Sequence, residues 1–244
     1  MQRSVTLPRN ARRPFFFVFC GFILLFTIYV TEIVPSSKIA FTLYQSVVGP
    51  AYTVVEDKGE FEEFSNVTGA RRFIVPNIIH FIRFNNFELN FVDYVVLLAA
   101  MRNQRPDKIY IHTNIQDVQY TGKYWDWVHQ NEELWMRIEV LHLEAPTEIF
   151  GQKLSEGWRF HHGSDIGRML VLMKYGGIYL DNDVFVIRSL DKYRKYECVI
   201  NWDENQFMAT QVIIAHKNAR FLTLWLDSYR LYRSDLWYKI YYFK

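Results

Sequence analysis

Cysteine is scarce in this chain, and so is any excess of charge of one sign. The 244 residues include two cysteines, Cys20 and Cys198, which lie in different parts of the sequence. A disulfide scaffold is excluded, because the globular part holds only one cysteine. The formal net charge is +2, with basic and acidic residues intermingled, so the sequence carries no nucleic-acid footprint. It also contains no internal repeats and no low-complexity tract.

One long hydrophobic run is present, at residues 15–34, and its only charge is Glu32 near the far end. A run of this length spans a bilayer. Four arginines precede it: Arg3, Arg9, Arg12 and Arg13. Basic residues before the run predict a cytoplasmic tail at 1–14, a transmembrane signal anchor at 15–34 and a translocated remainder. A cleaved signal peptide is the alternative, although its apolar region is usually shorter and no small-x-small site follows closely.

Residues 35–72 are predicted to form a luminal stem. They include the acidic patch 56–63, and charge runs of this kind usually belong to solvated segments. Translocation would make Asn66, in Asn-Val-Thr, a glycosylation site, with an unused site as the alternative.

From Phe73 to the end of the chain, the pattern becomes α/β and predicts one domain, 73–244. Apolar runs that suit strands alternate with longer segments of helical periodicity. Strands are predicted at 78–84, 108–112 and 138–143, and helices at 91–103 and 124–135. Strands that alternate with helices imply a mostly parallel, Rossmann-type sheet.

The most informative segment begins with a predicted helix after Ser164. Its apolar residues follow the i, i+3, i+4, i+7 spacing of a helix face packed on a core: Ile166, Met169, Leu170 and Met173. Asp165 and Arg168 share a neighbouring face. Ser164 is predicted to cap the helix start, and Gly176 with Gly177 to provide its left-handed stop.

The apolar run 178–180 is then predicted to be a buried strand, followed by Asp181 and Asp183 on the same side. Ligands in open α/β sheets bind beyond the carboxyl ends of strands. Two carboxylates presented together repel unless a cation lies between them. Mg²⁺ or Mn²⁺ fits, because these ions prefer oxygen ligands and often bind one or two carboxylates plus substrate phosphates. A solvated turn is the alternative for an isolated Asp-x-Asp pair.

The pattern Ser-Asp-x-x-Arg, then Leu, then Gly-Gly-Ile-Tyr-x-Asp-x-Asp resembles the sugar-nucleotide-binding core of the DXD glycosyltransferases. This group includes the yeast initiating mannosyltransferase, the α-1,4-galactosyl and N-acetylglucosaminyl transferases and, more remotely, the glucosylating clostridial toxins. The resemblance implies a GT-A fold. It also implies transfer of a hexose or N-acetylhexosamine from a nucleoside diphosphate sugar to a glycan, glycolipid or glycoprotein, with retention at the anomeric carbon.

Residue roles follow from the resemblance by position. It implies that Asp183, and less directly Asp181, bind Mn²⁺ or Mg²⁺ bridging the diphosphate, and that Asp165 and Arg168 contact donor-sugar hydroxyls. Tyr179 is included in the implied donor site. A metal acting as Lewis acid would stabilise the charge that grows on the departing phosphate. For Asp165 and Arg168 the structural alternative is a helix-dipole position and a salt bridge between them.

The run from Pro76 to Arg83 resembles the family's opening strand, which implies that His80 and Arg83 lie at the donor site. The family often has a tryptophan near the base where this chain has Arg83, which could stack on a base or pair with a phosphate. His80, on an otherwise apolar strand, suits a hydrogen-bonded core position better than a ligand or base.

Other aromatic and histidine side chains are weaker candidates for the same site. The tryptophans could platform a sugar ring, although most are expected in the core: Trp125, Trp127, Trp135 and Trp158. His161 and His162 precede the helix and could reach a diphosphate. The segment 202–205 contains carboxylates that could contact acceptor or metal, with a surface loop as the preferred interpretation.

These observations together predict a single-pass type II Golgi membrane protein with a luminal glycosyltransferase domain. The domain is short beside those of the family, which predicts a C-terminal truncation. A catalytically weak or inactive sugar-nucleotide-binding paralogue is therefore one alternative. A haloacid-dehalogenase-type phosphatase is the other, but Phe185 stands where that family has Thr or Val.

Overall fold

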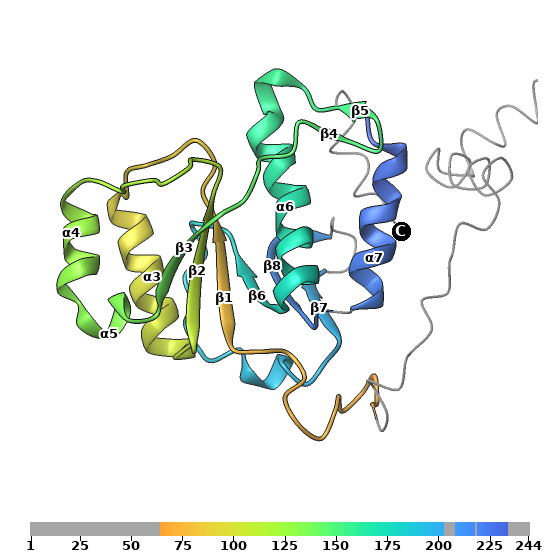
Figure 1. The fold of residues 1–244 in the computed structure, drawn as a ribbon. Helices are drawn as coiled ribbons and strands as arrows, with labels where there is room; N and C mark the ends of the chain where they lie inside the picture. Colours follow the sequence, from red (N-terminus) through yellow and green to blue (C-terminus); the bar gives the residue numbers. More distant parts are fainter. Residues whose placement is uncertain (1–63, 203–207, 218, 234–244) are drawn as a thin grey trace, which may run out of the picture. The chain divides into compact units, whose positions relative to one another are not determined.

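The computed structural model describes residues 64–202, 208–217 and 219–233 (Figure 1). Their main feature is a six-stranded sheet with the order β3-β2-β1-β6-β8-β7. Its strands are β1 (Ile78–Ile82), β2 (Lys108–Thr113), β3 (Ile138–His142), β6 (Gly177–Leu180), β7 (Cys198–Asn201) and β8 (Ala209–Ala215). A separate hairpin pairs β4 (Glu148–Ile149) with β5 (Gln152–Lys153).

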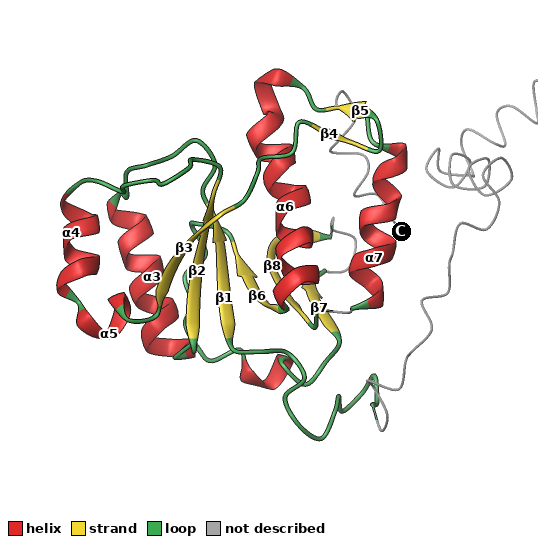
Figure 2. Ribbon diagram, viewed as in Figure 1, coloured by secondary structure: helices red, strands yellow, loops and turns green. Residues whose placement is uncertain are grey.

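The sheet is parallel through β3, β2, β1 and β6, and antiparallel where β8 joins β6 and β7. The parallel strands therefore direct their carboxyl ends to the same edge (Figure 2). This arrangement confirms the predicted α/β class with a mostly parallel sheet.

Helices cover both faces of the sheet (Figure 1). One face carries α3 (Phe91–Gln104), α4 (Lys123–Gln130) and α5 (Glu132–Trp135), which bury apolar side chains against β1, β2 and β3. The other carries α6 (Arg159–Tyr175) and α7 (Arg220–Ser228), which pack on β6 and β8. Because both faces are covered, the strands are apolar on both sides, as in parallel sheets generally.

The predicted strands and helices of the first half of the domain are confirmed, with small shifts at their ends. The predicted helix 124–135 is two helices in the structure, because the chain leaves helical geometry at Asn131. The Asn131 side chain accepts a hydrogen bond from the amide of Leu134 and so caps α5.

The predicted start of the motif helix is wrong. α6 begins at Arg159, directly after the short 3₁₀ helix η1 (Glu156–Trp158), and Ser164 therefore lies inside the helix. No side chain caps this start. A Ser-Asp pair resembles a cap in sequence, but here the preceding residues are already helical.

The predicted glycine stop is confirmed. Gly176 and Gly177 have φ angles of 67° and 120°, and the Gly176 amide donates to the carbonyl of Leu172 at 2.7 Å. A Cβ atom on Gly177 would lie 2.6 Å from the carbonyl oxygen of Ile78. Only glycine therefore lets the chain turn directly from α6 into β6, which places Asp181 at the carboxyl end of a central strand.

Two further sets of contacts lie near β7, at the edge of the sheet. Glu197, just before β7, accepts from the backbone amide and side chain of Arg220 and so holds the first turn of α7. Residues 64–72, predicted as the end of the stem, contact this region: the amide of Ala70 donates to the carbonyl of Lys195, and Ser65 bridges Gly69.

The predicted tail at 1–14, the anchor at 15–34 and most of the stem lie outside the described residues. Among the helices of the described part, none is long and apolar enough to cross a membrane.

Candidate active site

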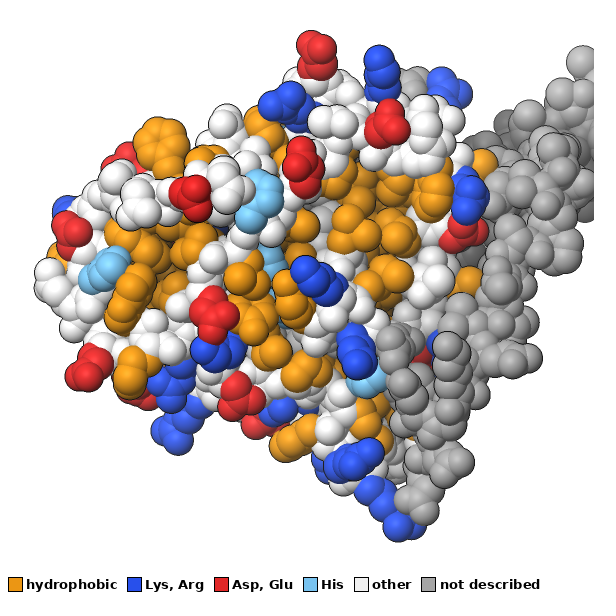
Figure 3. Space-filling view, in the orientation of Figure 1, with side chains coloured by type: hydrophobic (Ala, Val, Ile, Leu, Met, Phe, Trp, Pro, Cys, Tyr) orange, Lys and Arg blue, Asp and Glu red, His pale blue; other side chains and the backbone are white. Residues whose placement is uncertain are grey.

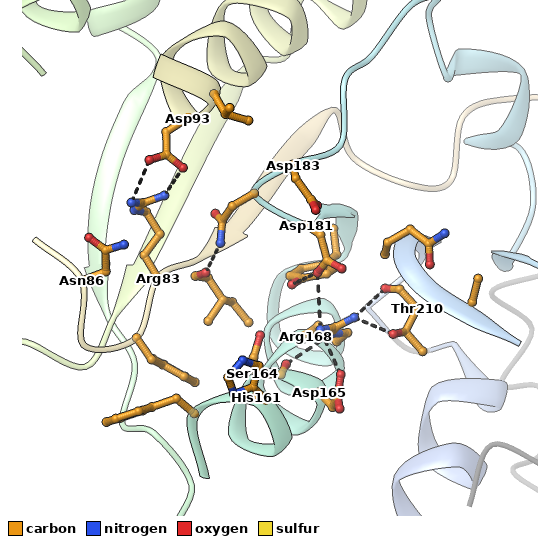
Figure 4. A pocket seen from close by; sticks show the side chains of 18 of the residues that line it. Arg83, Asn86, Asp93, His161, Ser164, Asp165, Arg168, Asp181, Asp183 and Thr210 are labelled. Carbon is orange, nitrogen blue, oxygen red and sulfur yellow. Dashed lines mark hydrogen bonds and ion pairs between the residues drawn. The ribbon is translucent and has the colours of Figure 1, made fainter. Parts of the chain in front are cut away.

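A cavity of about 970 Å³ opens at the carboxyl ends of β1 and β6 (Figure 4). Its walls come from the β1 end, the start of α3, one face of α6, the segment after β6 and the start of β8. The polar and charged residues that line it are Arg83, Asn86, Asn90, Asp93, His161, Ser164, Asp165, Arg168, Tyr179, Asp181, Asn182, Asp183, Thr210 and Gln211. The cavity lies where ligands bind in open α/β sheets.

One face of α6 supplies a row of polar side chains to this cavity. His161, Ser164, Asp165 and Arg168 all line it, and they follow the i, i+3, i+4, i+7 spacing of a single helix face. Apolar residues on the other side of the helix, such as Ile166 and Met169, are buried in the core. One face of α6 therefore packs on the core, and another face lines the cavity.

Arg168 is the centre of the site. Its Nη2 lies 2.9 Å from Asp165 Oδ1 and 3.4 Å from Asp181 Oδ1, and its Nη1 donates to the carbonyl and hydroxyl oxygens of Thr210 at 2.8 and 2.6 Å. The Nε atom donates to the Ser164 carbonyl. The guanidinium thus joins α6, the β6 end and β8, and it holds two carboxylates in place (Figure 4).

Tyr179 orients Asp181 from below. Its hydroxyl donates to Asp181 Oδ1 at 2.6 Å, and the Arg168 guanidinium lies 4.7 Å from the centre of its ring. Burial raises the pKa of the Tyr179 phenol, so the hydroxyl stays protonated and continues to donate. The Tyr179 hydroxyl and Arg168 Nη2 both contact Oδ1 of Asp181. The Oδ2 atom of Asp181 has no hydrogen bond from the described residues.

Asp183 differs from the other carboxylates of the cavity. It is exposed, and no hydrogen bond or ion pair reaches it from the described residues. Two arginines offset two of the four aspartates that line the cavity, so two negative charges remain there. That balance suits a divalent cation.

The donor set also fits Mg²⁺ or Mn²⁺, with Asp181 and Asp183 as the residues that would hold it. Both are oxygen ligands, and both line the same cavity. In the described part of the chain, no group of three or more His, Cys, Asp or Glu side chains could form a complete metal cage. The remaining ligands would have to come from substrate or water, as is usual for these ions with phosphates.

Sequence reasoning missed three contributors to the site. The Asn182 side chain donates to the Ile82 carbonyl at 2.8 Å, which ties the segment between the two aspartates to the end of β1. Thr210 and Gln211 come from β8, which pairs antiparallel with β6. Neither β8 residue carries a local sequence pattern that indicates the cavity.

Arg83 does line the cavity, but its side chain is committed to the protein. Nη1 and Nη2 contact the two carboxylate oxygens of Asp93 at 2.5 and 3.0 Å, and Nη2 also donates to the Glu88 carbonyl. Asp93 Oδ2 accepts in addition from the Asn90 amide as part of the capping box of α3. The arginine therefore fixes the loop before α3, a role different from the predicted contact with base or phosphate.

His80 does not line the cavity. It is fully buried, where its Nδ1 lies 3.0 Å from His112 Nε2 and its Nε2 lies 2.8 Å from the Gly176 carbonyl. Burial lowers the pKa of His80 to about 4 and that of His112 to about 3, so both rings are neutral at pH 7. The structure places His80 at the hydrogen-bonded core position and not at the predicted donor-binding one.

The predicted peripheral residues are also located. Of the tryptophans, Trp125 is buried, whereas Trp127, Trp135 and Trp158 are partly exposed. His162 is buried and does not line the cavity, and its Nδ1 lies 2.5 Å from the Tyr232 hydroxyl. Asn66 is exposed in the turn that Ser65 and Gly69 close, which keeps the predicted glycosylation site accessible.

Comparison with known families identifies the segment that carries this site. Residues 92–200 match the family described as "Glycosyltransferase sugar-binding region containing DXD motif". The match includes the α6 face and both aspartates after β6. The predicted resemblance is thus confirmed over this segment, which is similar to the sugar-binding region of DXD glycosyltransferases.

Two curated relatives are similar to parts of the chain. Glucan organizing enzyme 1 of Cryptococcus neoformans var. grubii is 24% identical over 182 residues, which cover 67% of this chain and 46% of that protein. An uncharacterized protein of Arabidopsis thaliana is 31% identical over 103 residues, which cover 40% of this chain and 16% of that protein. The chain thus spans less than half the length of these relatives.

Two solved glycosyltransferase structures are similar over about two thirds of the chain. The PaToxG glycosyltransferase has 17% identity and a TM-score of 0.47, covering 68% of this chain and 66% of that one. The galactosyltransferase LgtC, solved with donor and acceptor sugar analogues, has 16% identity and a TM-score of 0.40, covering 67% of this chain and 69% of that one.

Proposed function

We propose that this chain transfers a hexose or N-acetylhexosamine from a nucleoside diphosphate sugar to a glycan, glycolipid or glycoprotein acceptor, with Mn²⁺ or Mg²⁺ and with retention. One observation carries the proposal. Arg168 holds Asp165 and Asp181 together in a cavity that also contains Asp183, which has no partner in the described part of the chain, all within the segment that matches the family's sugar-binding region. Retention and the class of sugar rest on the family resemblance.

The two carboxylates after β6 would bind the metal through Asp183 and the free oxygen of Asp181. When bound, the metal supplies Lewis-acid stabilisation of the negative charge that develops on the departing diphosphate. Tyr179 and Arg168 hold Asp181 in one orientation, which prevents its side chain from rotating away when substrate is absent. Preorganisation of this kind removes a cost from the transition state.

On the α6 face, the roles of Asp165 and Arg168 separate. All three nitrogens of the Arg168 guanidinium contact protein atoms, so we assign it to positioning the carboxylates. Asp165 is the residue we assign to a hydroxyl of the donor sugar, since carboxylates accept hydrogen bonds from hydroxyls. This assignment differs from the equal roles predicted from the resemblance.

We place the domain in the Golgi lumen, attached by the apolar run 15–34. The arginines before that run and the exposed Asn66 in its Asn-Val-Thr sequence support this placement.

The test is metal-dependent hydrolysis of a panel of sugar nucleotides by the wild type and by Asp183→Ala. We expect release of nucleoside diphosphate from at least one donor only with Mn²⁺ or Mg²⁺, and at least a 100-fold lower rate in the variant. Its free energy of unfolding should stay near that of the wild type, since Asp183 is exposed. Binding of the donor without hydrolysis would favour the inactive paralogue, and metal-independent hydrolysis would contradict the proposal.

A further inference from the structure

The polar row on α6 continues beyond Asp165, toward the mouth of the cavity. His161 precedes Asp165 by one helical turn and also lines the cavity. It is exposed, and no hydrogen bond reaches its ring from the described residues. Both ring nitrogens therefore remain available to a ligand. The assigned donor residues do not account for this side chain.

Trp158 extends the same row outward. Its side chain is 52% exposed, and its ring packs edge-on against His161 with the ring centres 5.2 Å apart. It lies at the junction of η1 and α6, and it reaches the cavity wall through its contact with His161. An exposed indole is a flat apolar surface with a polar N–H, a combination suited to a pyranose ring, which has apolar faces and hydroxyl edges.

Trp158 and His161 lie on the side of the donor-sugar position that is away from the proposed metal site. In Figure 4, Asp181 and Arg168 lie between Asp183 and His161. Trp158 precedes Asp165 by about two helical turns, or roughly 10 Å along the axis. With the diphosphate at Asp183 and the donor sugar at Asp165, a group bound on the far side of the sugar from the diphosphate would lie near His161, against which Trp158 packs.

We propose that Trp158 and His161 form a subsite for the acceptor, and that the acceptor group bound there is the terminal pyranose of a glycan. The indole of Trp158 stacks against the sugar ring, and His161 forms a hydrogen bond with one of its hydroxyls. This inference rests on the proposed function, because it takes Asp165 as a residue that contacts the donor sugar.

The experiment uses the full-length protein, the best donor of the panel and three acceptor probes: methyl α-mannoside, methyl β-galactoside and methyl β-N-acetylglucosaminide. Disaccharide formation is measured by mass spectrometry against acceptor and donor concentration separately. We expect Trp158→Ala to raise the acceptor KM about tenfold, the loss of one aromatic stacking contact, with a much smaller change in donor KM. Trp158→Phe should restore part of the difference, and His161→Gln should preserve acceptor binding better than His161→Ala.

Trp127→Ala is the matched control, because Trp127 is 42% exposed and packs against Tyr94 and Tyr124, neither of which lines the cavity, whereas Trp158 packs against the cavity-lining His161. The subsite is overturned if Trp158→Ala behaves like this control, if either variant acts mainly on donor KM, or if the wild type hydrolyses donor but transfers to none of the probes. Absence of metal-dependent hydrolysis in the wild type would instead contradict the proposed function itself.

Discussion

The arginine–carboxylate pairs of the cavity differ in how completely they are satisfied. Arg83 and Asp93 form a closed pair: both carboxylate oxygens face the guanidinium, and the side chains are 5% and 7% exposed. Arg168 forms an open arrangement, because it reaches both Asp165 and Asp181, and the Asp181 side chain remains 33% exposed. The His80–His112 pair belongs with the closed kind, since its hydrogen bonds end on protein atoms.

Within one cavity, the closed pair therefore has a structural role, and the open group has a functional role. In the closed pair the two terminal guanidinium nitrogens and both carboxylate oxygens are already engaged with each other, so the pair fixes the loop that carries it. The open arrangement leaves the Asp181 carboxylate partly exposed, and the neighbouring Asp183 has no hydrogen-bond or ion-pair partner among the described residues. We therefore expect substitutions in the closed pairs to act on stability, and substitutions in the open group to act on activity.

The largest effect is expected for Arg168→Met. Removal of the guanidinium leaves Asp165 buried without its ion-pair partner, so the free energy of unfolding should fall by about 3–5 kcal/mol. Donor hydrolysis should fall by at least 100-fold, because Asp181 loses its orientation. Urea unfolding and the hydrolysis assay measure the two effects. Arg230→Ala is the control, since its ion pair with Asp227 is exposed, and an activity close to wild type in Arg168→Met would remove the distinction between the two regions.

The closed pair is tested by Arg83→Met, Asp93→Leu and the double variant. Each single substitution should lower the free energy of unfolding by about 3–5 kcal/mol, because it leaves one buried charge unpaired. The double variant should recover most of that loss, as replacement of a whole buried pair by apolar side chains often does. A double-mutant cycle by urea unfolding measures the coupling. Additive losses would show that the pair does not act as a unit.

The histidine pair predicts a dependence of stability on pH. The pKa values of His80 and His112 in the folded state, about 4 and about 3, lie below the ordinary value of 6.5. The unfolded chain therefore binds protons first, so the stability contribution is complete above pH 6.5 and is lost as the pH falls toward 4. Two such groups correspond to a loss of about 3 kcal/mol between pH 6.5 and pH 5.

Urea unfolding across this pH range measures the slope. His129→Gln should leave the slope unchanged, because His129 is exposed. A wild-type slope that matches the titration of carboxylates alone would contradict a neutral, buried histidine pair.

The sequence predicts those parts of the fold that are determined by residue spacing within a single segment. The apolar strands, the glycine turn at Gly176 and Gly177, and the α6 face with Asp165 and Arg168 all follow from spacing within one segment. Figure 3 shows hydrophobic side chains still visible over α3–α5 and over α6–α7, consistent with exposed residues such as Phe91, Trp127 and Phe221. Exposed aromatics of this kind explain why composition alone does not separate core from surface.

The unpredicted parts depend on tertiary contacts. Asp93 meets Arg83 only because α3 packs beside β1, and this pairing decides that the arginine is structural. Thr210 reaches Arg168 because β8 lies beside β6 and runs antiparallel to it. No local sequence pattern indicates this pairing. The apolar residues around His80 in the sequence indicate its interior location, whereas its partner His112 lies on the neighbouring strand and is not indicated by any local pattern.

The most direct test of the metal site is a calorimetric titration of nucleoside diphosphate, with and without Mn²⁺, into the wild type and Asp183→Asn. The account predicts binding that requires Mn²⁺ in the wild type, and at least tenfold weaker binding in the variant, whose amide keeps the shape of the side chain but removes its charge. It also predicts equal unfolding free energies for the two proteins. Equal affinity in both proteins, or wild-type binding that does not depend on the metal, would contradict it.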